Sequence, residues 1–143
     1  SFGYVSRMDT LQAAILRYKL EVLPGVIERR RSYAALYREY LDPEHVFMAP
    51  ERDVEFNTYH TFVIQVDCRD ELKAHLEEQQ IGSAIHYPLP LHLQPAASDF
   101  GHKAGDFPVT ERQAERILSL PVHQTLGQDD VRRVAATVNS FFG

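Results

Sequence analysis

A proline-rich segment, IGSAIHYPLPLHLQPA at residues 81–96, constrains the fold of this chain more than any other feature. Its first part, Ser83 to Tyr87, has the pattern of a short buried strand. Pro88 and Pro90 then exclude both helix and continued sheet pairing, because proline has a fixed φ and no N–H to donate. The sequence therefore predicts a strand that gives way abruptly to a rigid loop.

Two polar aromatic side chains lie at this transition. His86 and Tyr87 end the predicted strand, where side chains commonly face clefts. A purely structural interpretation stays open, in which the prolines only end the strand and His86 and His92 bond to the backbone. The segment alone does not decide between a binding site and a strand end.

Composition limits the classes of function. The chain has 143 residues, of which 44% are hydrophobic, enough for one globular domain. A net charge of −5 argues against nucleic-acid binding, and the Arg29–Arg31 run is expected to be a solvated helix face. The single cysteine, Cys68, cannot form an internal disulfide, and no apolar run reaches membrane-spanning length. We therefore expect a cytoplasmic protein without a membrane partner.

The first part of the chain has helical periodicity. Apolar residues recur at three- and four-residue spacings from residue 8 to 23, and Asp9 with Gln12 forms a capping box. Pro24-Gly25 is expected to break or kink the helix, and a second helix follows over Val26–Leu41. The aromatic stripe of this second helix predicts core or subunit interface. Residues 1–41 are thus predicted to be two linking helices that lead into a small domain at residues 42–143.

The small domain alternates strand and helix patterns. Thr58–Val66 alternates like a central strand, a helix capped by Asp67 covers residues 69–79, and a short strand is expected at residues 45–48. Leu120–Val122 is expected to be an edge strand, because Pro121 cannot donate to a ladder. If the strands 58–66 and 83–87 are parallel, their crossover is right-handed.

The last third of the chain is predicted to contain a loop followed by two helices. Residues 97–106 are expected to be an irregular loop, and a capping box at Thr110 starts a helix that ends near Leu118. The final helix covers residues 128–142. The fold class is α+β: a small mixed or antiparallel sheet of about three or four strands, with helices packed mainly on one face.

No catalytic set is complete within the chain. Its seven histidines are dispersed and no metal-ligand spacing occurs, so no metal site is predicted. The glycines stand singly, which excludes a phosphate-binding glycine loop. Cys68 is expected to be buried rather than a nucleophile. No catalytic residue is predicted.

Several motifs occur in a particular order along the whole chain. They are GYVSRMDTLQAAIL at residues 3–16, YHTF at 59–62, the segment 82–96, GDFPV at 105–109 and LSLPVH at 118–123. In this order they strongly resemble the C-terminal part of the DegT/DnrJ/StrS family of pyridoxal-phosphate-dependent sugar-nucleotide aminotransferases. Within the family they look most like enzymes that aminate a 3-keto UDP-N-acetylglucuronate, a step of polysaccharide biosynthesis.

The resemblance implies a fold-type I aminotransferase that works as a homodimer. In such enzymes the N-terminal large domain holds pyridoxal phosphate through a lysine. None of the chain's lysines, Lys19, Lys73 and Lys103, stands in the motif that carries the family lysine. The chain is therefore identified as the small domain with its leading helix, inactive alone and expected to bind no cofactor by itself. Because it does not begin with Met, a start inside a longer reading frame is expected.

The resemblance also implies substrate-binding residues. Arg7 matches a family arginine that approaches the substrate in the neighbouring subunit, while Val5 replaces the asparagine that contacts the cofactor phosphate. His86 and Tyr87 match a pair that lines the substrate side of the neighbouring subunit's site. His92 matches a family position as well, for which a structural role is expected.

Two departures leave an alternative open. Gln80 stands where the family usually has a helix-ending glycine, and Ala97 where an aromatic is common. The chain is either part of an active aminotransferase or a truncated, non-catalytic module that self-associates or binds sugar nucleotides.

Overall fold

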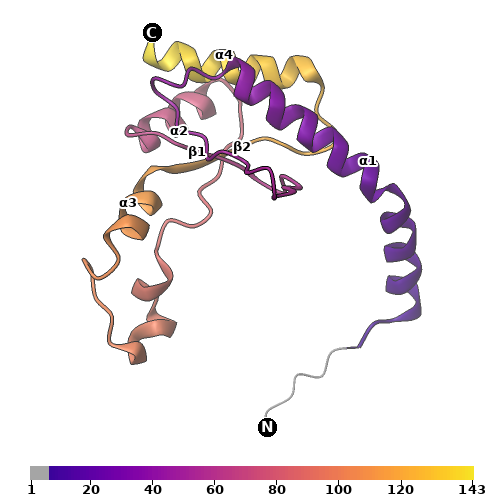
Figure 1. Ribbon diagram of the computed structural model, residues 1–143, viewed down its shortest axis with the longest axis horizontal. Helices are drawn as coiled ribbons and strands as arrows, with labels where there is room; N and C mark the ends of the chain where they lie inside the picture. Colours follow the sequence, from indigo (N-terminus) through magenta and orange to yellow (C-terminus); the bar gives the residue numbers. More distant parts are fainter. Residues whose placement is uncertain (1–6) are drawn as a thin grey trace.

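The structure, a computed structural model, describes residues 7–143 and has the predicted α+β architecture (Figure 1). The elements, in chain order, are α1 (Thr10–Tyr40), β1 (Phe62–Gln65), α2 (Arg69–Glu78), the 3-10 helices η1 (Leu91–Leu93) and η2 (Pro95–Phe100), α3 (Pro108–Arg116), β2 (Ile117–Leu120) and α4 (Gln128–Phe142). The helix predicted at residues 128–142 is confirmed, and the one predicted at 69–79 is one residue shorter.

The sheet is built on β1 and β2, which pair antiparallel with Phe62 opposite Leu120. The strand predicted at 58–66 is shorter than expected, because Tyr59 has a positive φ of 48° that interrupts extended backbone. The prediction of an edge strand at Leu120–Val122 was wrong. The strand ends at Leu120, just before the proline, and pairs on both sides.

Single bridges extend the sheet on either side. Phe47 pairs with Gln65 of β1, and Ala84 pairs antiparallel with Ser119 of β2. The strands expected at 45–48 and 83–87 are thus one bridge each, since prolines follow both segments closely. Four segments lie across the sheet, as the sequence predicts, but only two form a regular ladder, and Ala84 makes no parallel pairing.

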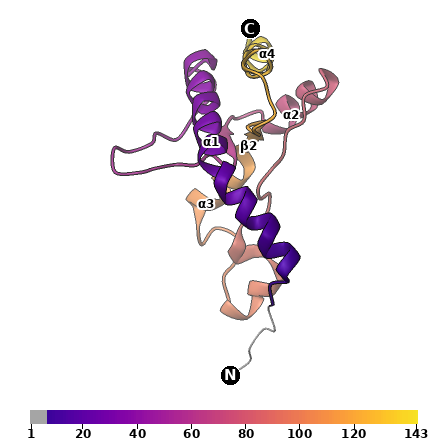
Figure 2. The ribbon, with the colours of Figure 1, turned by 90° about the vertical axis from the view of Figure 1, so that its right-hand side faces the viewer.

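The helices gather on one face of the sheet. Figures 1 and 2 show α2, α4 and the C-terminal half of α1 on the same side of the strands. Alternate strand residues point to this side and are buried, as the period of a strand requires. The fully buried side chains of the core include Tyr37, Ile64, Leu72, Leu76, Leu118, Val131 and Val138.

Helix α1 is one continuous helix with Pro24 in its interior, so the prediction of two successive helices was wrong. Proline removes one hydrogen bond and forces a bend, and Figure 1 shows α1 changing direction along its length. The capping box of Asp9 and Gln12 is present, as predicted. The helix buries residues only in its C-terminal half: Tyr33, Ala34 and Tyr37.

The N-terminal half of α1 projects from the body and exposes apolar side chains, with Leu11 73% exposed. A second projection is formed by residues 86–107, which we call the arm; it carries η1 and η2. Figures 1 and 2 show both projections on the side of the sheet opposite α4. The helix pattern at residues 8–23 therefore predicts the helix correctly, while its apolar stripe is outside the core of this chain.

Three local predictions fail in the second half of the chain. The loop expected at 97–106 begins inside η2, which starts at Pro95. Helix α3 starts at Pro108, because a proline at the first helical position presets the helical φ; the capping box expected at Thr110 is therefore not formed. Cys68 is exposed, not buried, and is itself the residue that precedes α2 in place of Asp67.

None of the helices in residues 7–143 combines the length and the apolar character that a membrane crossing requires. The aromatic side chains Tyr33 and Tyr37 of the predicted linking segment lie in the same core as the sheet. The division of the chain at residue 41 remains a prediction.

Candidate functional site

His86 lies beside the face of the sheet that the helices leave uncovered. Leu118 and Leu120 of β2 point into the core, so Ser119 between them points to the opposite face. There the Ser119 hydroxyl is 3.0 Å from Nδ1 of His86. This hydrogen bond fixes one ring nitrogen and leaves Nε2 available to a ligand.

A cavity of about 580 Å³ opens next to this pair. Its wall comes from residues 60–61 just before β1, the end of β2 with the loop that follows it, residues 80–84, and side chains of α1 and α4. The ionisable side chains that line it are Arg30, His60, His86, His123, Asp130 and Arg133. Two arginines face one aspartate, so the cavity carries a net positive charge that suits an anion.

The arginines of this cavity are fixed by backbone oxygens. Nη1 of Arg30 donates to the carbonyl oxygens of Tyr59 at 3.3 Å and His60 at 3.1 Å. Nη2 of Arg133 donates to the carbonyl oxygen of Gln79 at 2.7 Å. The expectation that Arg29–Arg31 form a solvated helix face was wrong, because these side chains connect α1 to the loops before β1 and after β2.

Tyr87 projects from the start of the arm. Its side chain is 74% exposed, and its ring meets the His86 ring edge-on with centroids 5.7 Å apart. Tyr87 also lines a hollow of about 230 Å³ between the arm and α3, together with Pro90 and Gln113. The two residues are neighbours, yet they face different hollows.

Arg7 lies at the start of α1, in a surface hollow of about 600 Å³ lined also by Met8, Gln12, Ile15 and Leu16. This hollow shares no lining residue with the two others. The chain therefore brings His86 and Tyr87 together but does not add Arg7 to them. Val5, the predicted departure from the cofactor-binding asparagine, lies outside the described residues.

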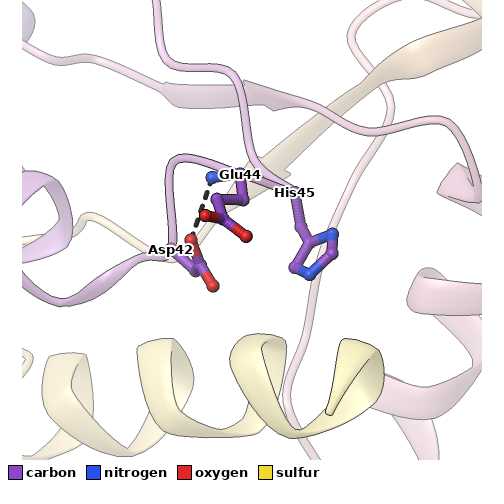
Figure 3. A group of neighbouring side chains, drawn as sticks. All are labelled: Asp42, Glu44 and His45. Atoms are coloured by element: carbon purple, nitrogen blue, oxygen red, sulfur yellow. Dashed lines mark hydrogen bonds between the residues drawn. The ribbon is translucent and has the colours of Figure 1, made fainter.

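One group of side chains within residues 7–143 has the composition of a metal site. Potential ligand atoms of Asp42, Glu44 and His45 lie within 4.8 Å of one another (Figure 3). Oδ1 of Asp42 already accepts the backbone N–H of Glu44 at 2.9 Å, and the His45 ring stacks on Phe142 at 4.8 Å. These contacts give the three side chains a structural role, because they hold a tight turn against α4.

The lysines do not fit the role of a cofactor anchor. Lys19 is exposed on α1, Lys103 is exposed in the arm, and Lys73 on α2 lies 3.8 Å from Glu77. A lysine that binds pyridoxal phosphate needs a pocket with partners for the phosphate and the ring. None of the three lines one of the five described cavities. That the chain alone binds no pyridoxal phosphate remains a prediction.

Sequence reasoning missed several residues around this site. Arg30 was assigned to a solvated helix face and Arg133 was not singled out, because only the folded chain brings α1 and α4 to the same cavity. Glu111 is the acceptor for several donors of the arm. Its place in the first turn of a helix, after a glycine-containing loop, could have marked it.

The fold matches part of aminotransferases of known structure. DesV of S. venezuelae, solved in complex with a ketimine intermediate, superposes with a TM-score of 0.93 at 32% identity, covering 99% of this chain and 38% of DesV. The family model of the DegT/DnrJ/EryC1/StrS aminotransferases matches residues 1–139. The chain belongs to this family.

Proteins with similar sequences also match this chain over nearly its whole length. A protein of Geobacillus stearothermophilus named as a pleiotropic regulatory protein is 38% identical over 143 residues, which is 98% of this chain and 38% of that protein. The dTDP-3-amino-3,6-dideoxy-alpha-D-galactopyranose transaminase of Aneurinibacillus thermoaerophilus is 36% identical over 139 residues, 97% of this chain and 38% of that enzyme. The chain thus spans about 38% of the length of these relatives.

Proposed function

We propose that this chain is the substrate-side, C-terminal part of a pyridoxal-phosphate-dependent aminotransferase that acts on a keto-sugar nucleotide. Membership of the family over nearly the whole chain is the observation that carries the proposal. The cationic cavity beside His86 supports it, because a nucleotide sugar is an anion.

The residue roles follow from their positions. His86 and Tyr87 would bind the sugar through Nε2 and the phenol hydroxyl, while the Ser119 bond holds the imidazole. Arg7, like His86 and Tyr87, would serve the active site of a second subunit in a homodimer, because the family residues that they match line the neighbouring subunit's site. Within its own chain Arg7 lies apart from the other two. Pyridoxal phosphate, bound by the large domain of the longer protein, would carry the amino group.

For the substrate we propose a UDP-linked 3-keto-hexuronate, with glutamate as amino donor. The motifs of this chain look most like those of enzymes for such sugars, and a uronate adds a second anionic group that a cationic cavity can hold. Comparing turnover of UDP-linked and dTDP-linked keto-sugars, with and without the carboxylate, tests this choice. Equal turnover of the neutral sugar would exclude a role for the carboxylate.

The roles are tested in the full-length enzyme with His86→Ala. We expect kcat/KM for the keto-sugar nucleotide to fall by roughly 10- to 100-fold, since a hydrogen bond to a charged group contributes about 1.5–3 kcal/mol. Arg7→Ala should have a similar effect.

Cofactor absorbance should stay unchanged in both variants. The exposed Lys103, farther along the arm, supplies the control Lys103→Ala, which should leave both quantities unchanged. Parallel loss of cofactor binding and substrate use would show that the roles are assigned wrongly.

A non-catalytic, self-associating module is the second candidate. The exposed apolar half of α1 favours it, because such a surface is commonly covered by a partner. Sedimentation analysis of the 143-residue chain and of Leu11→Glu distinguishes the two. A stable dimer that Leu11→Glu dissociates, together with no binding of UDP-sugars in calorimetric titration, would support the module over the enzyme.

A further inference from the structure

The arm, residues 86–107, is fixed to the body at both of its ends. At the near end, backbone bonds join Ala84 and Ser119 at 2.7 and 3.2 Å, immediately before His86. At the far end the chain enters α3, which runs directly into β2. Both ends of the arm therefore connect to the same strand.

The far end is organised by one carboxylate, that of Glu111 in the first turn of α3. Its Oε1 and Oε2 accept the N–H of Gly105 at 3.0 and 2.9 Å, and Oε1 also accepts the N–H of Phe107 at 3.2 Å. Nε2 of His92, in η1, lies 2.9 Å from the same Oε1. One side chain thus connects η1, the loop before α3 and α3 itself.

This contact is enclosed by aromatic rings. The His92 side chain is only 8% exposed, and the Phe107 ring lies 4.7 Å from the His92 ring and 5.0 Å from the His102 ring. Gly105 has a φ of +93°, a conformation that side chains disfavour and that turns its N–H toward Glu111. The backbone is therefore shaped around the carboxylate.

A carboxylate suits these donors in a way that an amide does not. The N–H groups of Gly105 and Phe107 point at the Glu111 carboxylate, whose oxygens only accept hydrogen bonds. These backbone hydrogen bonds, that of Gly105 first, hold the pKa of Glu111 below its usual value. A glutamine of equal size would place its own NH₂ donors against at least one of these groups. An aspartate keeps the charge but is one methylene shorter.

We propose that Glu111 is a positioning residue for nucleotide-sugar binding: through His92, Gly105 and Phe107 it holds the arm so that His86 and Tyr87 face the substrate. The inference rests on the proposed function. In this role Glu111 itself does not contact the sugar. It acts through the arm, whose base carries the two substrate-binding side chains.

The first measurement uses Glu111→Gln in the full-length enzyme. We expect the KM for the keto-sugar nucleotide to rise by about tenfold or more, with kcat changed less than about twofold and cofactor absorbance unchanged. Glu111→Asp should recover part of the loss. Glu115→Gln, an exposed glutamate on the same helix, is the matched control and should behave as wild type.

The second measurement follows amide hydrogen exchange in the same proteins. Glu111→Gln should speed exchange at Gly105 and Phe107, while the β1 amides stay protected. His92→Phe keeps the ring packing on Phe107 but removes the donor to Glu111. It should raise KM by a smaller factor, and it keeps the proposal testable if Glu111→Gln does not fold.

The outcomes distinguish a failure of the proposed function from a failure of the positioning role of Glu111. A wild-type enzyme that turns over no keto-sugar nucleotide overturns the proposed function and this inference with it. An active wild type whose KM is unchanged by Glu111→Gln and His92→Phe overturns the inference alone, even if the arm amides exchange faster. If Glu115→Gln raises KM as much as Glu111→Gln, the inference is also overturned. The rise would then come from the lost negative charge on α3 and not from the contacts of Glu111.

Discussion

At the scale of single residues, two tyrosine hydroxyls join α1 to the loop that follows β2. The Tyr37 hydroxyl donates to the carbonyl oxygen of Pro121 at 2.8 Å, and the Tyr33 hydroxyl donates to that of Leu126. The Tyr37 ring is fully buried and stacks on Phe62 at 4.8 Å, and burial raises the pKa of its phenol above the usual value. These bonds fix the wall of the cavity beside His86.

Tyr37→Phe tests the strength of this connection. We expect the free energy of unfolding to fall by about 1–2 kcal/mol, because the part-buried Pro121 carbonyl loses its partner while the ring packing is kept. Urea denaturation measures the change. The exposed Tyr18 supplies the control Tyr18→Phe, and an equal stability of Tyr37→Phe and wild type would contradict the expected role.

Residue-level prediction from the sequence succeeds where one residue's chemistry decides. Gln80 occupies a position where the family usually has a helix-ending glycine. Its φ of +58° is the left-handed backbone that such a glycine adopts. The pairing of His86 with Ser119 was not predictable, because it depends on a strand register set by distant residues. Glu111 and His92 are likewise 19 positions apart.

At the scale of elements, the loop between Pro50 and Tyr59 is fixed by Glu51. Its carboxylate accepts from Nη1 of Arg31 at 2.7 Å, from the N–H of Asn57 at 2.7 Å and from the Tyr59 hydroxyl at 2.8 Å. These donors, with Arg31 the strongest, lower the pKa of Glu51 from 4.5 to about 2. The loop is thus tied to α1 by an ionised group.

This depressed pKa predicts how the loop responds to acid. Because folding lowers the pKa, the stabilisation by ionised Glu51 is complete above pH 4.5 and is lost as the pH falls toward about 2. The amide resonance of Asn57 should therefore shift within that range. In Glu51→Gln the shift should disappear, and in the control Glu39→Gln, on the exposed face of α1, it should persist.

Element prediction works best where one periodicity runs without interruption. Helix α4 was predicted at its observed bounds, and Leu72 and Leu76 of α2 point inward as expected. Prolines caused most errors. Pro24 was expected to divide α1, which continues through it, whereas Pro108 starts α3 earlier than its side-chain pattern suggests.

At the scale of the whole molecule, the chain has a complete core and an incomplete surface. The sheet is covered on one face, while the N-terminal half of α1 and the arm extend from the other side (Figures 1 and 2). The chain spans about 38% of its relatives' length. The fold class was predictable, because the apolar stripes of α2, α4 and the C-terminal half of α1 mark the faces that these helices bury.

The lysines give a prediction for the whole chain. When it is mixed with pyridoxal phosphate and reduced with borohydride, we expect no stoichiometric adduct, because Lys19, Lys73 and Lys103 lie at the surface. Mass spectrometry of peptides should find only scattered labelling. A single lysine modified in full would contradict the absence of a cofactor anchor in this chain.

The packing of α1 on α4 also has a consequence for biosynthesis. The buried residues of α1 share one core with Val131, Val134 and Val138 of α4, and the α1 tyrosines donate to carbonyl oxygens more than 80 positions downstream. While the ribosome is still translating the region before α4, these surfaces have nothing to pack against. We therefore expect the nascent chain to depend on chaperones until α4 has left the exit tunnel.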